Sequence, residues 1–332
     1  MDIANSTTRP FRVGFLLIDG FALLSYSAAI EPLRAANLLA GRKLYEIEQL
    51  PVLGGQSVSS SGAIIKASAH LGERVDFDLI LVVAGGDPAR FSDERIYQWL
   101  RHLARRGVRM GGVSGGPVIL AQSGIMAGRR MTVHWEHAPA LAEFAPALIL
   151  ERTIYVIDRD RLTCAGGTAA LDMMHALITG HHGADFARRV SDWFVHTEIR
   201  PAGGPQRAGP VERYGTASTP VLRAIELMEN HIADPLELGQ LADLTGLGAR
   251  QLNRLFKDKL GRSTMGFYRD LRLDKADNLL SQSTLNITEI ALAAGFANSA
   301  HFSHSYRQKF GRSPSARRGQ FARSDLPERH RV

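Results

Sequence analysis

A serine at a strand–helix junction is the first residue whose position could support chemistry. Val113-Ser114-Gly115-Gly116 follows an apolar run typical of a buried strand and precedes a helical pattern. A sharp turn of this kind presents a serine hydroxyl in the manner of a nucleophile elbow. A serine attacks only with a positioned base and usually a third group that orients the base. Hydrolysis of an amide or ester is therefore one hypothesis for Ser114.

Binding is a second use of the same geometry. Backbone N–H groups at the start of the helix after Ser114, helped by the helix dipole, suit a carboxylate. Aromatic faces near this point would suit a quaternary ammonium or a guanidinium, although Phe21 and Trp135 could equally be ordinary core aromatics. The tight turn at Gly85–Gly86 would border the pocket. The predicted site for a zwitterion comprises Phe21, Tyr26, Gly86, Ser114, Gly115, His134, Trp135 and Glu136.

A third chemistry is found in the last third of the chain. Residues 218–332 hold 17 Lys and Arg against 12 Asp and Glu, so most of the net charge of +7 lies there. In the helical pattern Ala249–Leu260, Arg250, Asn253 and Arg254 share the face opposite the apolar residues. Arginine and asparagine pair with guanine and adenine edges in the major groove. This face predicts contact with double-stranded DNA, although a polar face of this kind in one unit alone could equally be a solvated helix surface.

These candidate residues need elements that position them. Before residue 200, short apolar runs alternate with helical patterns, which predicts a flavodoxin-like α/β domain with a parallel sheet covered on both faces. The expected strands are Phe11–Ile18, Asp78–Ala84, Val108–Val113, Thr153–Ile157 and Leu162–Ala165. The expected helices are Ser25–Ala40, Ser92–Arg106 and Thr168–Ile178. Sites in such sheets lie at the carboxyl ends of the strands.

The rest of the chain is predicted to be all-α. A Pro- and Gly-rich segment, 199–217, separates the predicted domains 10–198 and 218–318 as a linker. Two helix-turn-helix units are expected at 236–261 and 287–311, each with a glycine turn. In tandem, their second helices could enter successive major grooves of one DNA face. The outward residues expected on the second of these helices are Ser299, Ala300, Ser303, His304 and Arg307.

Composition limits the function classes. The chain has 332 residues, 45% apolar and 22% charged, which is typical of globular domains. Its apolar runs are too short to span a membrane, its start does not resemble a signal peptide, and its single cysteine, Cys164, excludes a disulfide framework and a cysteine-based zinc site. We therefore expect a cytoplasmic protein without metal, cofactor or membrane contact.

Residues Arg272–Phe321 resemble the signature of AraC/XylS transcription regulators. The matches include Ile287–Ala291 (I-x-E-I-A), Gly295–Phe296 and Gly311-x-x-Pro314-Ser315. The resemblance covers about 100 residues and implies base contacts by the residues matching Arg250, Asn253, Arg254, Ser299, Ser303 and His304. Tyr306 replaces the usual phenylalanine of that family.

The first 200 residues resemble the class I glutamine-amidotransferase-like (intracellular-protease-type) domain, through segments 14–37, 82–91, 111–135 and 162–178. Enzymes of that fold carry a cysteine where this chain has Ser114, and the partner histidine matches His134. The family's acid falls on Ser25, so the resemblance implies a degenerate catalytic site.

Together the two resemblances predict a ligand-responsive, sequence-specific regulator rather than an enzyme. It would sense a small amino acid- or betaine-like metabolite, activate catabolic genes through RNA polymerase, and act as a homodimer. The alternatives are a hydrolase or amidase that uses Ser114 and His134 and is tethered to DNA, or a nonspecific nucleoid-type protein, which the modest charge disfavours.

Overall fold

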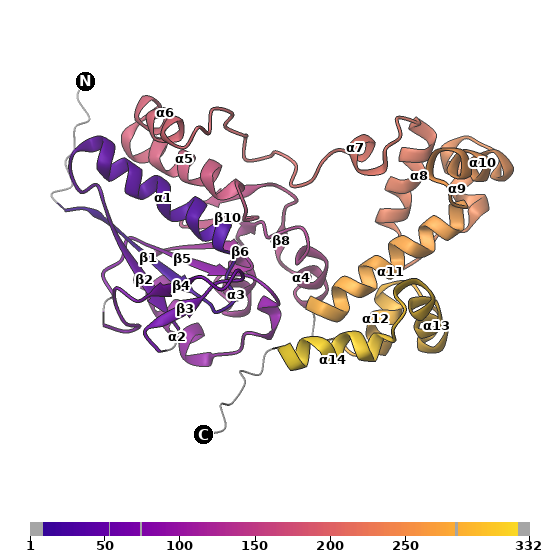
Figure 1. Ribbon diagram of the computed structural model, residues 1–332, viewed down its shortest axis with the longest axis horizontal. Coiled ribbons are helices and arrows are strands. Elements are labelled where there is room, and N and C mark those ends of the chain that lie inside the picture. Colours follow the sequence, from indigo (N-terminus) through magenta and orange to yellow (C-terminus); the bar gives the residue numbers. More distant parts are fainter. Residues whose placement is uncertain (1–8, 53, 74, 283–284, 325–332) are drawn as a thin grey trace. The chain divides into compact units, whose positions relative to one another are not determined.

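The computed structural model describes residues 9–52, 54–73, 75–282 and 285–324 (Figure 1). The chain forms two compact units, Met1–Gln206 and Arg207–Val332, each with its own hydrophobic core. The division after Gln206 falls inside the segment that the sequence predicts to be a linker.

The first unit is built on a six-stranded sheet with the order β2-β1-β5-β6-β10-β9. Its strands are β1 (Phe11–Leu17), β2 (Tyr45–Pro51), β5 (Leu79–Ala84), β6 (Arg109–Ser114), β9 (Tyr155–Asp158) and β10 (Arg161–Cys164). All neighbouring pairs are parallel except β9 with β10, so the sheet is parallel, as predicted, apart from one antiparallel pair at this edge. Only Arg159 and Asp160 join these two strands, and so short a connection forces an antiparallel hairpin.

Helices cover both faces of this sheet (Figure 1). One layer comprises α1 (Leu23–Ala40), α5 (Ala169–His182) and α6 (Ala184–Trp193), and the other comprises α2 (Glu94–Arg105) and α3 (Gly116–Gln122). Successive residues of β1 serve opposite layers, since Phe15 packs in the α1–α5–α6 core and Leu16 in the α2–α3 core. The sheet is therefore buried on both sides, as its near-continuous apolar strands predict.

Smaller elements complete the first unit. They are β3 (Gln56–Val58), β4 (Ile64–Lys66), a 3₁₀ turn at Pro88–Arg90, β7 (Arg130–Met131), α4 (Ala138–Phe144) and β8 (Ile149–Leu150). The edge strand β2 was not predicted, because polar Glu46, Glu48 and Gln49 interrupt its apolar pattern.

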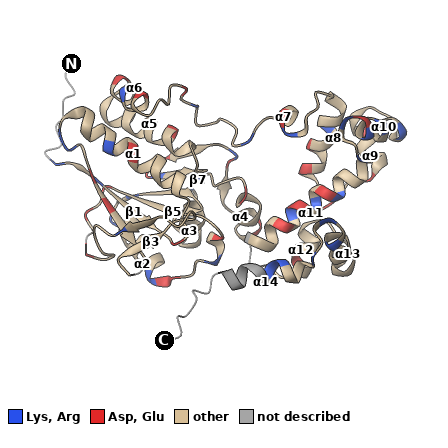
Figure 2. Cartoon of the chain, viewed as in Figure 1, with Lys and Arg blue, Asp and Glu red and all other residues tan. Residues whose placement is uncertain are grey.

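The second unit is helical in its described part, as predicted (Figure 2). Its helices are α7 (Pro210–Tyr214), α8 (Thr219–Asn230), α9 (Leu238–Thr245), α10 (Ala249–Leu260), α11 (Thr264–Gln282), α12 (Ile287–Ala293), α13 (Ser299–Phe310) and α14 (Pro314–Ser324). The pairs α9–α10 and α12–α13 correspond to the two expected helix-turn-helix units, and α11 contacts helices of both. In each unit an αL glycine, Gly246 or Gly295, makes the turn.

Partly buried polar contacts explain why α11 and its neighbours carry several charged and polar side chains. The guanidinium of Arg272 donates to the carbonyl oxygens of Ala294 and Gly295 at 2.9 and 2.5 Å and lies over the Phe296 ring. The Tyr306 hydroxyl, which the usual phenylalanine would lack, donates to Asp277, and Arg317 donates to both oxygens of the same carboxylate at 2.8 Å. These contacts hold α12, α13 and α14 on α11.

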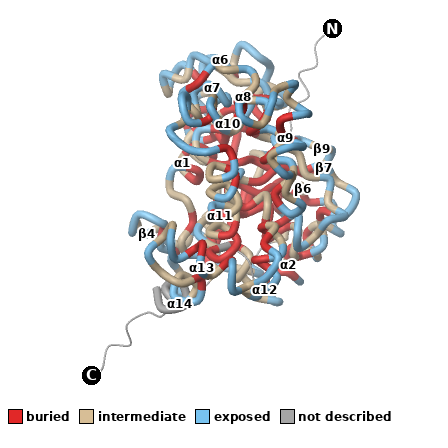
Figure 3. The backbone as a smooth tube through the Cα atoms, turned by 90° about the vertical axis from the view of Figure 1, so that its right-hand side faces the viewer, coloured by how far each residue is buried: buried red, intermediate tan, exposed pale blue. Residues whose placement is uncertain are grey.

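The extent of burial differs strongly from one element to another (Figure 3). Strand β5 is buried at every residue, whereas α10 buries only Leu252 and Phe256. Strand β5 is therefore enclosed by the core of the first unit, whereas the outer face of α10 is available for a partner.

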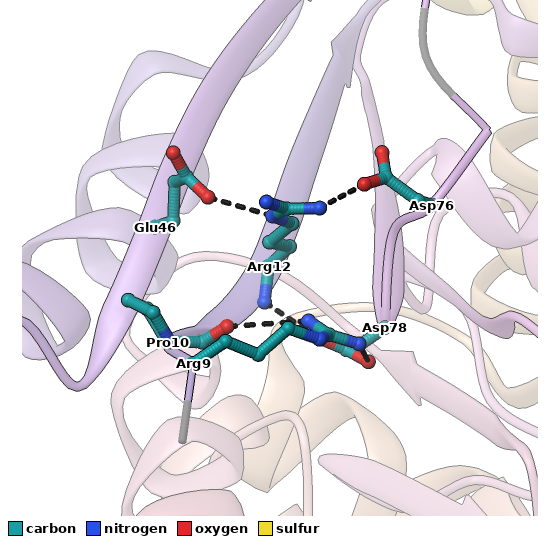
Figure 4. A network of polar contacts seen from close by, with 6 residues as sticks. All are labelled: Arg9, Pro10, Arg12, Glu46, Asp76 and Asp78. Atoms are coloured by element: carbon teal, nitrogen blue, oxygen red, sulfur yellow. Dashed lines mark hydrogen bonds and ion pairs between the residues drawn. The ribbon is translucent and has the colours of Figure 1, made fainter. Parts of the chain in front are cut away.

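A network of charged residues lies at the edge of the sheet where β1, β2 and β5 begin (Figure 4). Asp78 accepts hydrogen bonds from both terminal nitrogens of Arg9, at 2.7 and 2.8 Å, and from the backbone N–H of Arg12 at 2.8 Å. The Arg12 side chain pairs with Glu46 and Asp76. This network lies at the edge opposite the carboxyl ends of these strands, so its role is structural.

We expect Asp78→Asn to lower the free energy of unfolding by about 1 kcal/mol at pH 7, because two Arg9 donors lose a charged acceptor. Burial alone would raise the pKa of Asp78, but the hydrogen bonds and charges of Arg9 and Arg12 lower it overall. The contribution is therefore present above the unfolded-state pKa and is lost as the pH falls through the lower folded-state value. Urea denaturation at several pH values measures it, with the exposed Asp192→Asn as the control. An equal loss in both variants would contradict the account.

Candidate functional site

Ser114 lies at a strained turn, as a nucleophile elbow requires. It ends β6 with a φ of 61°, which is rare for a residue with a side chain. The N–H of Gly115 donates to the carbonyl oxygen of Ala84 at 3.0 Å and so fixes the turn to β5. A Cβ on Gly116 would lie 1.9 Å from the carbonyl oxygen of Val82, which explains the glycine at that position.

The residues around Ser114 do not form a catalytic triad. The backbone N–H of His134 donates to the carbonyl oxygen of Ser114 at 3.5 Å, but among the described residues no hydrogen bond joins the Ser114 hydroxyl to the His134 ring. The Nδ1 atom of His134 accepts from the N–H of Glu136 at 3.4 Å, and its ring lies against Trp135. Ser25, at the family's acid position, accepts a hydrogen bond from the N–H of Gly167 at 2.7 Å. A serine cannot replace the carboxylate that orients a base.

Burial changes the ionisation of His134 and of the single cysteine. Burial lowers the pKa of His134, and the nearby Glu136 carboxylate only partly opposes this effect. The single cysteine, Cys164, is fully buried, and burial raises the pKa of its thiol to about 12. A thiol with that pKa supplies almost no thiolate at neutral pH.

A cavity of about 210 Å³ lies beside this turn. Its lining residues are His134, Trp135, Ile154, Ala165, Gly166, Gly167, Thr168, Ala169, Arg200 and Gln206. Ser114 lies directly behind the cavity wall, because a Cβ on Gly166 would approach the Ser114 Cβ to 2.7 Å. Of the residues predicted to bind a ligand, the lining therefore includes His134 and Trp135.

The other predicted ligand residues lie elsewhere. Phe21 and Tyr26 are buried in the α1–α5–α6 core, where their rings pack edge to face at 5.5 Å, so they form no aromatic cage. Gly86 is exposed in the loop after β5. Gly115 is buried with its N–H already bonded, and Glu136 approaches His134 at 3.8 Å without lining the cavity.

The start of helix α3, which the sequence predicts to bind a carboxylate, is less suited to this than the start of α5. Helix α3 has only seven residues, with Pro117 in its first turn, so few free N–H groups face outward. The 14-residue helix α5 instead begins at the cavity wall, with Gly167, Thr168 and Ala169 among the lining residues. The N–H of Gly167 donates to Ser25 and that of Ala169 to Gly166, whereas the hydrogen bonds of the described residues include none from the N–H of Thr168. The sequence shows a usable signal for a site at the start of α5, because Gly166–Gly167 directly follows the expected strand Leu162–Ala165 at the carboxyl edge of the sheet.

Two lining residues come from the segment predicted to be a linker. Arg200 donates to the Asp172 carboxylate through Nε (2.9 Å), Nη2 (2.6 Å) and its backbone N–H (2.9 Å). Asp172 is fully buried and also contacts His196 at 3.0 Å. The Nε2 atom of Gln206 lies within 3.1 Å of three oxygens of the first unit, from Thr132, Val133 and Thr153.

The first predicted recognition helix, α10, presents most of the expected residues outward. Arg250 and Arg254 are exposed on the face opposite the buried Leu252 and Phe256. Asn253 is half-buried, and its Oδ1 accepts the N–H of Thr264 at 3.0 Å, which caps the start of α11. The structure therefore gives Asn253 a structural contact that its outward helical position does not predict.

The second recognition helix, α13, divides in a similar way. His304 and Arg307 are exposed, whereas Ser299 and Ser303 are half-buried near the packed side of Phe302 and Tyr306. Gln308 is also exposed and approaches His304 at 3.0 Å, so it extends the outward polar face beyond the predicted residues. Gln308 lies one helical turn after His304, so helical periodicity could have predicted that it shares this face.

Known proteins are similar to each of the two units and to the chain as a whole. Residues 11–180 match the family model described as DJ-1/PfpI family, and residues 241–320 match a helix-turn-helix domain. The HTH-type transcriptional regulator GlxA of Rhizobium meliloti (strain 1021) is 45% identical over 308 residues, which cover 92% of this chain and 95% of that protein. The chain belongs to the HTH-type transcriptional regulators with a DJ-1/PfpI domain.

Other members of this regulator family are similar over nearly the same length. The HTH-type regulators CdhR and GbdR of Pseudomonas aeruginosa are 40% and 36% identical, over 91% and 94% of this chain and 89% and 85% of their own lengths. A crystal structure of an AraC family transcriptional regulator from Pseudomonas putida has a TM-score of 0.52 and 26% identity, and covers 56% of this chain and all of that one. The predicted AraC-type and amidotransferase-like resemblances are confirmed, and the chain is a DNA-binding transcription regulator.

Metal-binding clusters and membrane-spanning helices are both absent from the described residues. No group of three or more His, Cys, Asp or Glu side chains there could hold a metal ion. Within the same residues, no helix combines the length and apolar character that crossing a bilayer requires.

Proposed function

We propose that this regulator senses a small zwitterionic metabolite, an amino acid or a betaine, in the cavity beside Ser114. The observation that carries the proposal is the composition of the cavity wall, which combines the start of α5 with Trp135. Backbone N–H groups at a helix start favour a carboxylate, and an indole face favours a cationic nitrogen.

The size of the cavity supports a ligand of this class. A volume of about 210 Å³ lies below the roughly 300–1,000 Å³ typical of pockets for drug-sized molecules. A metabolite of amino-acid size fills such a space. We propose that the occupied protein acts as a homodimer and activates catabolic genes through contact with RNA polymerase.

We further propose that the N-terminal unit binds its ligand without converting it. Three observations support this proposal: no described hydrogen bond joins the Ser114 hydroxyl to the His134 ring, a serine stands at the acid position, and the thiol is buried. The strained elbow at Ser114 favours a second candidate, hydrolysis of an amide or ester, which the following experiment separates from binding.

Titration calorimetry of the full chain with glycine, L-alanine, glycine betaine and carnitine tests the proposal. We expect saturable heat with at least one probe, recovery of that probe intact, and unchanged heat in Ser114→Ala. Product that disappears in Ser114→Ala would establish the hydrolase instead, and no heat with any of these probes would overturn the zwitterion class.

Trp135→Ala is expected to weaken binding of the responding probe about tenfold, because a desolvated cation–π contact contributes about 1–2 kcal/mol. The matched control is Trp193→Ala, which removes a half-exposed indole from α6, outside the cavity lining. The same calorimetric titration measures both variants. Equal affinity of the two variants would remove Trp135 from the site.

A further inference from the structure

The segment that leads to the DNA-binding unit forms part of the cavity wall. Arg200 and Gln206 both line the cavity, and each is held by hydrogen bonds to the first unit. Between them, the carbonyl oxygen of Ala202 accepts the N–H of Ile154 at 3.2 Å, and Gly204 is buried near the Ile154 side chain. Residues 200–206 are thus docked along their length and are not a free linker.

The second unit has its own anchor just beyond this segment. In α7, the side chains of Arg213 and Tyr214 donate to the Glu229 carboxylate of α8 at 2.6 and 2.7 Å. The Tyr214 ring packs against Phe267 of α11 with a centroid distance of 5.7 Å. Helix α7 therefore belongs to the DNA-binding unit and moves with it.

Only Arg207, Ala208 and Gly209 separate Gln206 from α7. Three residues span at most about 10 Å, whereas the ten residues 200–209 span about 35 Å when extended. The docking of 200–206 therefore decides how far the DNA-binding unit can move from the first unit.

We propose that Arg200 and Gln206 are effector-contacting residues, and that effector binding clamps 200–206 onto the first unit and so shortens the tether. The inference rests on the proposed function, because it takes this cavity as the effector site. The cavity wall is incomplete when the segment leaves, so the effector binds the docked state better. Any ligand with that preference shifts the equilibrium toward docking, by up to about 100-fold at a concentration of 100 Kd.

The docked segment is held by contacts that can be released. Gln206 shares its two amide hydrogens among three oxygens, and its own Oε1 is buried without a hydrogen-bond partner. An unpaired buried acceptor makes docking less favourable than a fully paired one. An effector therefore has an equilibrium to shift, and a shortened tether restricts the positions in which α10 and α13 can meet DNA together.

Hydrogen exchange of the full chain without any ligand tests the docking itself. The amides of Arg200 and Gly204, which donate to Asp172 and Pro201, and that of Ile154, which donates to Ala202, should be protected. Gln206→Ala should raise their exchange about tenfold, because it removes hydrogen bonds that hold the segment at the cavity wall. The matched control is Gln56→Ala, at an exposed position of β3. Rapid exchange of these three amides in the unaltered chain, or no change in Gln206→Ala, would overturn the proposal.

The second arm uses the probe among glycine, L-alanine, glycine betaine and carnitine that produces heat. Gln206→Ala should weaken its binding about tenfold, whereas Gln56→Ala should not. Ten Gly/Ser residues inserted between Ala208 and Gly209 lengthen the tether and leave the cavity intact. The insertion should preserve calorimetric affinity and remove the effect of the probe on operator affinity. A response to the probe that survives the insertion would overturn the proposal, whereas no heat in the unaltered chain would count against the proposed function alone.

Discussion

Gly116→Ala is expected to prevent stable folding of the first unit. The added Cβ would lie 1.9 Å from the Val82 carbonyl oxygen and 2.8 Å from its carbon, so it clashes with backbone that cannot rotate away. Strand β5, which carries Val82, is buried at every residue, and α3 would have to leave the sheet to relieve the clash. A loss of about 4 kcal/mol or more of unfolding free energy follows, at the upper end for single substitutions.

The matched control is Gly180→Ala, an identical substitution in α5. Gly180 is exposed, and a Cβ there meets no atom within 4 Å. Alanine has a higher helix propensity than glycine, so this variant should gain up to about 1 kcal/mol. Urea denaturation followed by circular dichroism compares the two variants. A folded Gly116→Ala protein of unchanged stability would show that α3 packs differently from the structure.

Arg254→Ala is expected to remove most of the sequence preference of the regulator while leaving it folded. Arg254 is exposed at the centre of the outer face of α10, and a bidentate arginine–guanine contact contributes about 1–3 kcal/mol of discrimination. The expected loss of operator affinity is therefore about 10- to 100-fold. Gel-shift titration with an operator selected from random DNA by the unaltered protein measures the loss at fixed salt.

The control for this variant is Arg223→Ala on α8, which removes the same charge from another exposed position of the unit. A phosphate-type or general electrostatic role would weaken binding to all sequences and reduce the salt dependence by about one ion. Equal effects of the two variants, without loss of preference in Arg254→Ala, would show that α10 does not read bases.

The parts of the molecule that were predicted correctly are those that depend on residues close together in the sequence. The order of strands and helices around Ser114 follows from apolar runs and a glycine pair, since α3 can approach β5 only over Gly116. The two helix-turn-helix units follow from helical periodicity and their αL glycines. The antiparallel pairing of β9 could have been predicted as well, because only residues 158–161 separate the expected strands Thr153–Ile157 and Leu162–Ala165, too few for a parallel crossover.

The cavity wall depends on contacts between distant residues, which periodicity does not contain. Arg200 reaches Asp172 across 28 positions and Gln206 reaches Thr132 across 74, both from a segment whose composition is that of a linker. Phe21 was predicted at the site because of its loop position, but it packs in the core beside Tyr26. Asn253 lies on the expected face of α10, yet it caps the following helix.

The most direct test of the account measures operator affinity of the full chain with and without a saturating concentration of the calorimetrically active probe. If the cavity controls the DNA-binding unit, affinity should change by about 5- to 150-fold, the usual range of coupling between two sites. The probe should bind more tightly to the operator complex by the same factor if affinity rises, or more weakly if it falls. An operator affinity that is identical with and without a probe known to bind would contradict the coupling of the two units.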